Sequence, residues 1–181
     1  MHRPARLARS TARLDGAPTA ASTPIPATVA FCTISKPIRP LTGWGDLRVA
    51  PEVVHALPER LRAGQLVFAS TGGLHAAGLF DLDGTPLLVR EDIGRHNAVD
   101  KVVGARLLAG EPTAVPLLAV SGRIGFEIVQ KAVAAGVGAL VAVGAPSSLA
   151  VDLAAKAGLC TIGFTGRERF VTYTAPERVG V

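Results

Sequence analysis

From residue 51 onward, segments with apolar side chains at helical spacing alternate with short apolar runs of strand length. Pro58 is expected to separate the first two helices, because a proline inside a helix removes a main-chain hydrogen bond. The spacing predicts helices over residues 51–57, 58–69, 97–109, 124–135 and 147–157. The apolar runs predict strands over residues 75–81, 85–90, 115–120, 139–143, 160–164 and 169–174.

The order of these elements predicts the fold class. The strands 75–81 and 85–90 flank an Asp-Gly pair at residues 83–84, which is typical of an antiparallel hairpin. Further along, helices follow buried strands, as in right-handed crossovers of a largely parallel sheet. The sequence therefore predicts an α/β domain over residues 49–181. We expect three layers, α/β/α, and a mixed sheet that begins with an antiparallel hairpin.

Residues 1–48 differ from the rest in composition. Residues 1–30 are rich in Ala, Thr, Pro and Arg without an apolar period, so the leader is predicted to be disordered. Residues 1–45 hold six basic residues against one acidic residue, whereas residues 46–181 hold thirteen of each sign. The net charge of +5 thus belongs to the leader, and with only 4% aromatic residues the folded part is not expected to bind nucleic acid. No segment is long enough to cross a membrane.

Residues 90–104 concentrate charged side chains. They hold six charged residues and one histidine, and Gly94 supplies a turn before the predicted helix. Arg95 and His96 should therefore lie at a helix N-terminus, where free N–H groups favour phosphate or carboxylate. A solvated loop in which the arginines and aspartates pair with one another explains the same charges about equally well.

Two further junctions between strand and helix, at residues 121–125 and 145–148, also supply small residues or an arginine. Arg123 would add a second guanidinium beside that of Arg95, an arrangement that suits a diphosphate. Ser147 and Ser148 are expected mainly to cap the last long helix. The pairs Glu127/Lys131 and Asp152/Lys156 are spaced as exposed ion pairs on helices, although Glu127 and Lys131 also remain candidates to face the site.

The chain has two cysteines, Cys32 and Cys160, which excludes a disulfide framework and fits a reducing compartment. Cys160 opens a short apolar strand and is predicted to lie in the core. Cys32 is the candidate nucleophile, because Lys36 would lower the pKa of its thiol. Its apolar surroundings also fit an ordinary thiol, so both interpretations stay open.

Four motifs carry a resemblance to a known family: TGGLHAAGLF at 71–80, REDIGRHNAVDKVVG at 90–104, SGRIGFEIVQKA at 121–132 and APSSLAVDLAAKAGL at 145–159. In this order they resemble the formate dehydrogenase accessory sulfurtransferase family, FdhD, over about residues 49–181. The resemblance implies a cytoplasmic homodimer with a cytidine-deaminase-like fold. It also implies sulfur transfer from a cysteine desulfurase to the molybdenum cofactor, in its bis-guanine-dinucleotide form, before insertion into formate dehydrogenase.

Residues near Cys32 depart from the family pattern. The family carries sulfur as a persulfide on a Cys-x-x-Cys loop, and here Ser35 stands at the second cysteine position. Full-length relatives also have an additional N-terminal portion, so the chain is expected to be truncated. Two hypotheses follow, beside the generic one of a structural α/β domain. The first is a sulfurtransferase that acts through Cys32. The second is a non-catalytic binder or chaperone of the guanine-nucleotide cofactor, or a degenerate relative that has lost the cysteine loop.

Family position and local pattern together nominate the residues that would bind the cofactor. GDP would be a partial mimic of this cofactor. The family's contact segment near the C-terminus has an arginine two residues after its phenylalanine, but here that position is Gly166 and the arginine is Arg167. The nominated residues are His75, Arg90, Asp92, Gly94, Arg95, His96, Asn97, Ser121, Gly122, Arg123, Phe164, Thr165, Gly166, Arg167, Glu168 and Arg169.

A zinc site is not expected. The cytidine deaminase fold places His-x-Glu at one helix start and Pro-Cys-x-x-Cys at the next. The matching positions here are residues 96–98, His-Asn-Ala, and residues 121–123, Ser-Gly-Arg. The general acid/base glutamate and both thiolates are missing from them.

Overall fold

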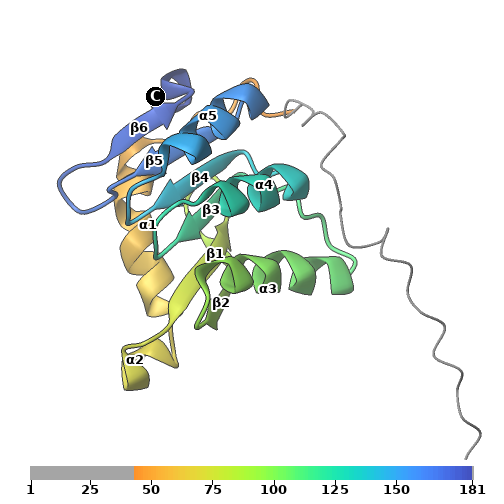
Figure 1. Ribbon diagram of the computed structural model, residues 1–181, viewed down its shortest axis with the longest axis vertical. Helices are drawn as coiled ribbons and strands as arrows, with labels where there is room; N and C mark the ends of the chain where they lie inside the picture. The colour runs from red at the N-terminus through yellow and green to blue at the C-terminus, as the bar shows by residue number, and fades with distance from the viewer. Residues whose placement is uncertain (1–42, 181) are drawn as a thin grey trace, which may run out of the picture. The chain divides into compact units, whose positions relative to one another are not determined.

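The structure is a computed structural model that describes residues 43–180. Helices and strands alternate along most of this part of the chain (Figure 1). In chain order the elements are α1 (Pro51–Ala63), α2 (Phe68–Thr71), β1 (His75–Phe80), β2 (Pro86–Asp92), α3 (Arg95–Leu108), β3 (Leu117–Val120), α4 (Phe126–Ala135), β4 (Ala139–Ala142), α5 (Ser148–Ala157), β5 (Cys160–Gly163), β6 (Val171–Thr174) and the 3-10 helix η2 (Pro176–Arg178).

The strands form one six-stranded sheet in the order β2-β1-β3-β4-β5-β6. Strand β1 is antiparallel to both β2 and β3, and β6 is antiparallel to β5. The pairs β3–β4 and β4–β5 are parallel. The predicted mixed sheet and its opening hairpin are confirmed, but the parallel part is limited to three strands. The prediction of a largely parallel sheet overestimated the number of parallel pairs. The reason is that β1 is joined to β2, and β5 to β6, without a crossover helix.

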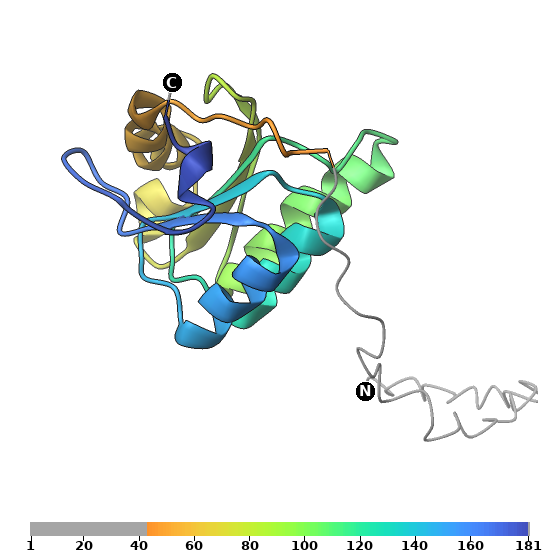
Figure 2. The same ribbon diagram turned by 90° about the horizontal axis from the view of Figure 1, so that it is seen from above.

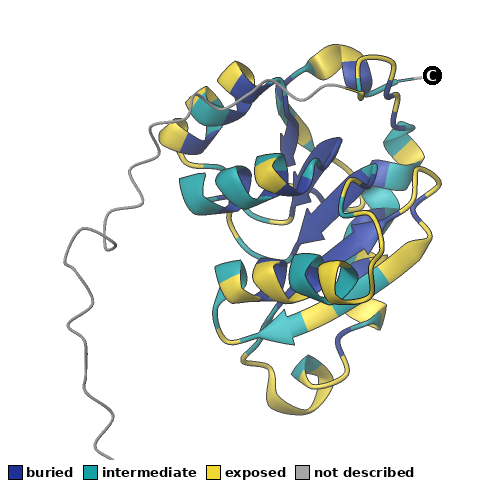
Figure 3. Ribbon diagram, turned by 90° about the vertical axis from the view of Figure 1, so that its right-hand side faces the viewer, coloured by how far each residue is buried: buried dark blue, intermediate teal, exposed yellow. Residues whose placement is uncertain are grey.

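Three layers are present, as predicted. Helices α3, α4 and α5 cover one face of the sheet and α1 covers the other (Figures 1 and 2). Alternate side chains of each central strand enter two different cores: Leu118 and Leu140 pack with the three-helix side, and Leu117 and Val141 pack with α1. Figure 3 shows buried residues concentrated in the sheet and exposed ones on the outer helix surfaces and loops.

Helix α1 runs through Pro58, so the predicted break at this proline is wrong. The missing hydrogen bond and the ring cost about 3 kcal/mol in a helix interior. Val54, Leu57 and Leu61 lie on one face of α1 and are at most 1% exposed. Burying each of them contributes about 1.5–3 kcal/mol, which is enough to hold the helix together across the proline. The continuation predicted to residue 69 is the separate short helix α2.

The described residues that precede position 49 contact the domain. The indole Nε1 of Trp44 donates a hydrogen bond to the carbonyl of Gly136 over 2.7 Å, and Leu47 is buried. Val49 forms a bridge with Val179 near the other end of the described chain. The remainder of the predicted disordered leader, residues 1–42, lies outside the described residues.

Several loops meet at one edge of the sheet because of the strand directions. Strands β2, β3, β4 and β5 end there, and β1, which runs the other way, begins there with His75 opposite Asp92. We refer to this place as the junction edge, formed by His75 and residues 92–95, 121–126, 143–148 and 164–170. The residues that the sequence predicts to bind a ligand, at the junctions between strand ends and helix starts, lie at this same edge.

Candidate functional site

The first two junctions lie against each other at the junction edge. Gly122 separates His75 from Arg95: a Cβ atom added to Gly122 would lie 3.3 Å from the His75 Nδ1 atom and 3.6 Å from the Arg95 Cβ atom. The junctions after β3 and β4 are also joined, because the Ile124 N–H donates to the carbonyl of Ala145 over 3.1 Å. The structure therefore brings together nominated residues that are far apart in sequence.

A pocket of about 450 Å³ opens where α4 and α5 begin. Its charged side chains are Arg95, Arg123 and Glu127, and the remaining wall is largely apolar. No described residue forms a hydrogen bond or ion pair with the Arg123 guanidinium. The lining residues are Arg95, Arg123, Ile124, Gly125, Phe126, Glu127, Ala145, Pro146, Ser147 and Leu149.

Glu127 was left open in the sequence as a candidate to face the site, although it was not among the nominated residues, and the structure places it on this pocket. Its Oε1 atom lies 3.0 Å from Arg95 Nη2 and 3.3 Å from His96 Nδ1, although the histidine contact does not have hydrogen-bond geometry. The carboxylate folds back over Gly125, where any Cβ atom would collide with both of its oxygens. A hydrogen bond from its own backbone N–H, together with the charge of Arg95, lowers the pKa of Glu127 against the opposing effect of burial. Glu127 is therefore ionised at neutral pH.

The expected ion pairs along single helices are not formed. Lys131 contacts Asp100 on α3 over 2.5 Å instead of Glu127, and no ion pair joins Asp152 to Lys156 in the described structure. Helix α4 packs beside α3, whose side chains offer closer partners than the next turn of α4 itself. A pair within one helix is worth only a few tenths of a kcal/mol, so such partners readily replace it. The alternative that Glu127 faces the site fits its observed position.

Asp92 holds the turn that presents Arg95. Its Oδ1 atom accepts hydrogen bonds from the Gly94 N–H over 2.9 Å and from Asn97 Nδ2 over 3.1 Å. Its Oδ2 atom lies 2.6 Å from Lys101 Nζ. The bond to Lys101, followed by those from Gly94 and Asn97, lowers the pKa of Asp92 to about 2. Three nominated residues thus form the scaffold of the turn.

Two other nominated residues make contacts within the sheet. The Ser121 hydroxyl accepts the N–H of Ala76 over 2.8 Å and so extends the pairing of β1 with β3. Arg90 is exposed and donates to the carbonyl of its neighbour Val89. Arg90 does not line the pocket at the starts of α4 and α5.

The loop after β5 contacts α1, and none of its residues lines that pocket. Phe164 adopts a positive φ of 52° and is 48% exposed. His55 on α1 contacts the carbonyl of Gly166 over 2.6 Å through Nδ1, and Arg167 lies 3.7 Å from Glu59. Of the nominated residues 164–169 in this loop, Gly166 and Arg167 therefore contact α1. His55 had no sequence signal for this role, because it lies 111 positions from its partner.

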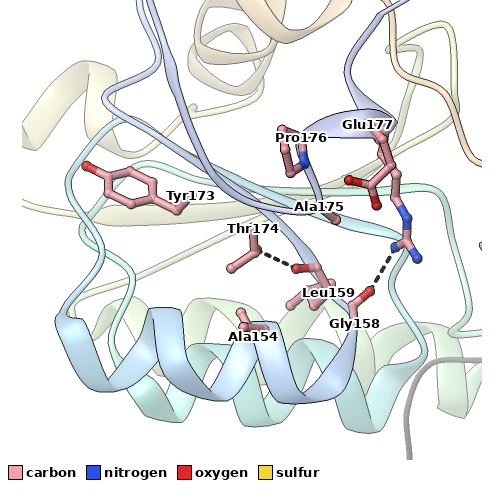
Figure 4. Close-up of a pocket in the computed structure, with 10 residues that line it drawn as sticks. Ala154, Gly158, Leu159, Tyr173, Thr174, Ala175, Pro176 and Glu177 are labelled. Carbon is pink, nitrogen blue, oxygen red and sulfur yellow. Dashed lines mark hydrogen bonds between the residues drawn. The ribbon is translucent and has the colours of Figure 1, made fainter.

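Two other pockets differ in their relation to the nominated residues. One of about 330 Å³ lies beside His75 and Ser121 and is also lined by Arg62 and Gln65. The other, about 380 Å³, lies between α5 and β6, at the ends of the strands opposite to the junction edge (Figure 4). Arg178 donates there to the carbonyl of Gly158 over 2.9 Å and closes the C-terminus of α5. No nominated residue lines this second pocket.

Of the two cysteines, only Cys160 lies among the described residues. It is buried in the core, as predicted, and burial raises the pKa of its thiol to about 11. Cys32 lies outside the described residues. Within residues 43–180, no three His, Cys, Asp or Glu side chains gather as a metal site. No helix in the same range has the length and apolar character needed to cross a bilayer.

The fold and this edge define an α/β protein with charged groups gathered where strands end and helices begin. The fold matches a solved structure described as a formate dehydrogenase accessory protein from Desulfotalea psychrophila. The two structures share a TM-score of 0.67 and 28% sequence identity, and the match covers 74% of this chain and 57% of that one.

The chain belongs to the FdhD/NarQ family, whose sequence pattern matches residues 18–180. A sulfur carrier protein FdhD from Nocardia farcinica is 58% identical over 141 residues, covering 77% of this chain and 50% of the relative. Its counterpart from Streptomyces coelicolor is 52% identical over 143 residues, covering 78% and 51%. The chain therefore spans about half the length of the curated relatives it matches. The family resemblance seen in the four motifs is confirmed.

Proposed function

We propose that the chain acts as a sulfur carrier in the maturation of formate dehydrogenase. In this proposal it takes sulfur from a cysteine desulfurase and delivers it to the molybdenum cofactor in its bis-guanine-dinucleotide form. Family membership and the relatives named as sulfur carrier proteins support the carrier role. The pocket at the starts of α4 and α5 is the observation that carries the cofactor part of the proposal.

Phosphate groups of the cofactor would bind in this pocket. Arg123 supplies a guanidinium with no partner among residues 43–180, and charge-assisted contacts from arginine to phosphate are among the stronger hydrogen bonds. The α5 N-terminus lies on the same pocket through Ser147, whose Oγ accepts the N–H of Ala150 over 3.3 Å. The partial positive charge of this helix end adds to the attraction for an anion.

Sulfur transfer would occur through Cys32. Its thiolate attacks the outer sulfur of a persulfide on the desulfurase, which leaves a persulfide on Cys32 and releases the donor's cysteine as a thiol. The outer sulfur of the Cys32 persulfide would then be passed to the cofactor, where it would take up two electrons from the reduced metal centre, and Cys32 would leave as its thiolate. Cys160 does not compete, because its thiol is buried and its pKa is raised to about 11.

A non-catalytic cofactor binder is the second candidate function. It is favoured by a specific observation, the serine at position 35 where the family has its second cysteine. Such a protein would bind guanine nucleotides without carrying sulfur. A homodimer and a cytoplasmic location belong to the proposal for either function.

Two measurements test the proposal. Calorimetric titration of the full chain with GDP is expected to show saturable binding, and absence of binding would overturn both functions. Incubation with a cysteine desulfurase and cysteine, followed by persulfide-specific labelling, should mark the wild-type chain and Cys160→Ala but not Cys32→Ala. GDP binding without a label on Cys32 would leave the non-catalytic binder.

A further inference from the structure

A carboxylate occupies one side of the pocket that was expected to attract phosphates. Glu127 folds over its own helix start at Gly125, and Arg95 Nη2 lies 3.0 Å from its Oε1 atom. The positive end of α4 and one of the two pocket arginines are therefore already balanced by a negative charge. A phosphate placed against Glu127 would be repelled, since the two groups carry the same charge. This side of the pocket favours a hydrogen-bond donor.

The wall near Glu127 suits a flat, largely apolar group. Phe126 and Pro146 line the pocket, and so does Leu149, which is 58% exposed. An aromatic heterocycle lying there would cover an apolar side chain that α5 leaves in solvent. The volume of about 450 Å³ lies within the range of small-ligand pockets.

We infer that Glu127 recognises the guanine base, with the carboxylate accepting the N1–H and the 2-amino group, while Arg123 contacts the phosphates. This inference rests on the proposed function and adds the specificity-determining residue. Guanine presents two adjacent donors that match two carboxylate oxygens. Adenine has an acceptor, N1, beside its amino group and cannot make this pair.

Arg95 orients the carboxylate in this arrangement. An ionised carboxylate has about four acceptor positions on its two oxygens, so the bonds from Arg95 and from the backbone N–H of Glu127 itself leave about two positions for the base. The Asp92 turn fixes the main chain from which Arg95 projects, through the bond from Gly94 N–H to Asp92 Oδ1. Arg95 is thus a positioning residue that acts on the base through Glu127.

Nucleotide preference tests the inference directly. GDP, xanthosine diphosphate and ADP are titrated into the full-length wild type, Glu127→Gln, and Glu111→Gln as the control. Glu111 is a half-exposed carboxylate paired with Arg106 and does not line the pocket. The wild type and the control should prefer GDP over the other two nucleotides by about tenfold to a hundredfold, the scale of one or two charge-assisted hydrogen bonds.

Glu127→Gln should weaken GDP by about tenfold to a hundredfold and strengthen xanthosine diphosphate, because xanthine replaces the 2-amino group with a carbonyl that the new carboxamide can donate to. The gain for xanthosine diphosphate cannot come from misfolding. If Glu127→Gln weakens GDP and ADP by the same factor, or keeps the wild-type preference, the inference is overturned although GDP binding stands. If the wild type binds none of the nucleotides, the proposed function is overturned, and the inference with it.

Discussion

His55 on α1 and Gly166 in the loop after β5 are joined by a contact of 2.6 Å between the imidazole Nδ1 atom and the main-chain carbonyl oxygen. A carbonyl oxygen only accepts, so Nδ1 carries the proton and donates it. The His55 ring also packs against Phe170 at the other side of the loop, with ring centroids 4.9 Å apart. One side chain thus fixes the path of the loop that carries the strained Phe164.

We therefore predict that His55→Ala loosens this loop while the fold persists. The lost hydrogen bond should lower the free energy of unfolding by about 1 kcal/mol. Amide hydrogen exchange should become faster at residues 164–170 and stay unchanged in β3 and β4. His55→Asn, which keeps a donor near the carbonyl, serves as the matched control and should exchange more slowly than His55→Ala. Equal exchange rates in wild type and His55→Ala would show that the contact between His55 and Gly166 does not hold the loop in place.

Arg123 is predicted to supply the main phosphate contact. Arg123→Ala should weaken GDP binding by about tenfold to a hundredfold, the loss of one charge-assisted contact of about 1.5–3 kcal/mol. The melting temperature should stay the same, because the guanidinium has no partner among the described residues. Arg60→Ala is the control, since Arg60 contacts the hairpin turn at Asp83. An equal loss of affinity in both variants would exclude a phosphate role for Arg123.

Much of the fold followed from local pattern. The hairpin strands around residues 83–84 and the later helices were predicted to within a few residues, because their periods and glycine ends are local features. The error at Pro58 has a different origin. The proline penalty is local, whereas the burial of Val54, Leu57 and Leu61 against the sheet is a tertiary effect that the pattern does not quantify.

The candidate site was predicted less completely for the same reason. The junctions carrying Arg95 and Arg123 were found, since strand ends and helix starts can be located in sequence. The partner of Glu127 was not predicted correctly, because Arg95 and Lys131 are both possible partners of this carboxylate. Only the packing of α3 beside α4 decides between them. His55 was missed because nothing local to it indicates a contact with Gly166.

Asp92 gives the structure a defined acid sensitivity. Its pKa of about 2 in the folded protein lies below the ordinary value of 3.8, so the unfolded chain binds this proton more readily. The stabilisation by Asp92 is therefore complete above about pH 4 and is lost as the pH falls toward about 2. Asp92→Asn should be less stable than wild type at pH 7, and the difference should shrink over this interval.

Chemical denaturation at several pH values measures this difference. Asp152→Asn is the matched control, because Asp152 forms no ion pair with any residue of the described chain. Its stability difference from wild type should not change between pH 7 and pH 3. A difference for Asp92→Asn that stayed constant down to pH 2 would show that the Lys101, Gly94 and Asn97 contacts do not stabilise the carboxylate.

The two thiols are predicted to differ sharply in reactivity. Cys160 is fully buried and its pKa is raised to about 11, so its thiolate is scarce at pH 8 and shielded from reagents. Iodoacetamide should therefore modify Cys32 in the native protein and both cysteines in guanidinium chloride, as mapped by peptide mass spectrometry. Cys160→Ala should keep the native labelling pattern, whereas Cys32→Ala should abolish it. Rapid native modification of Cys160 would mean that the β5 side of the core opens readily, and it would make Cys160 a second candidate for the persulfide.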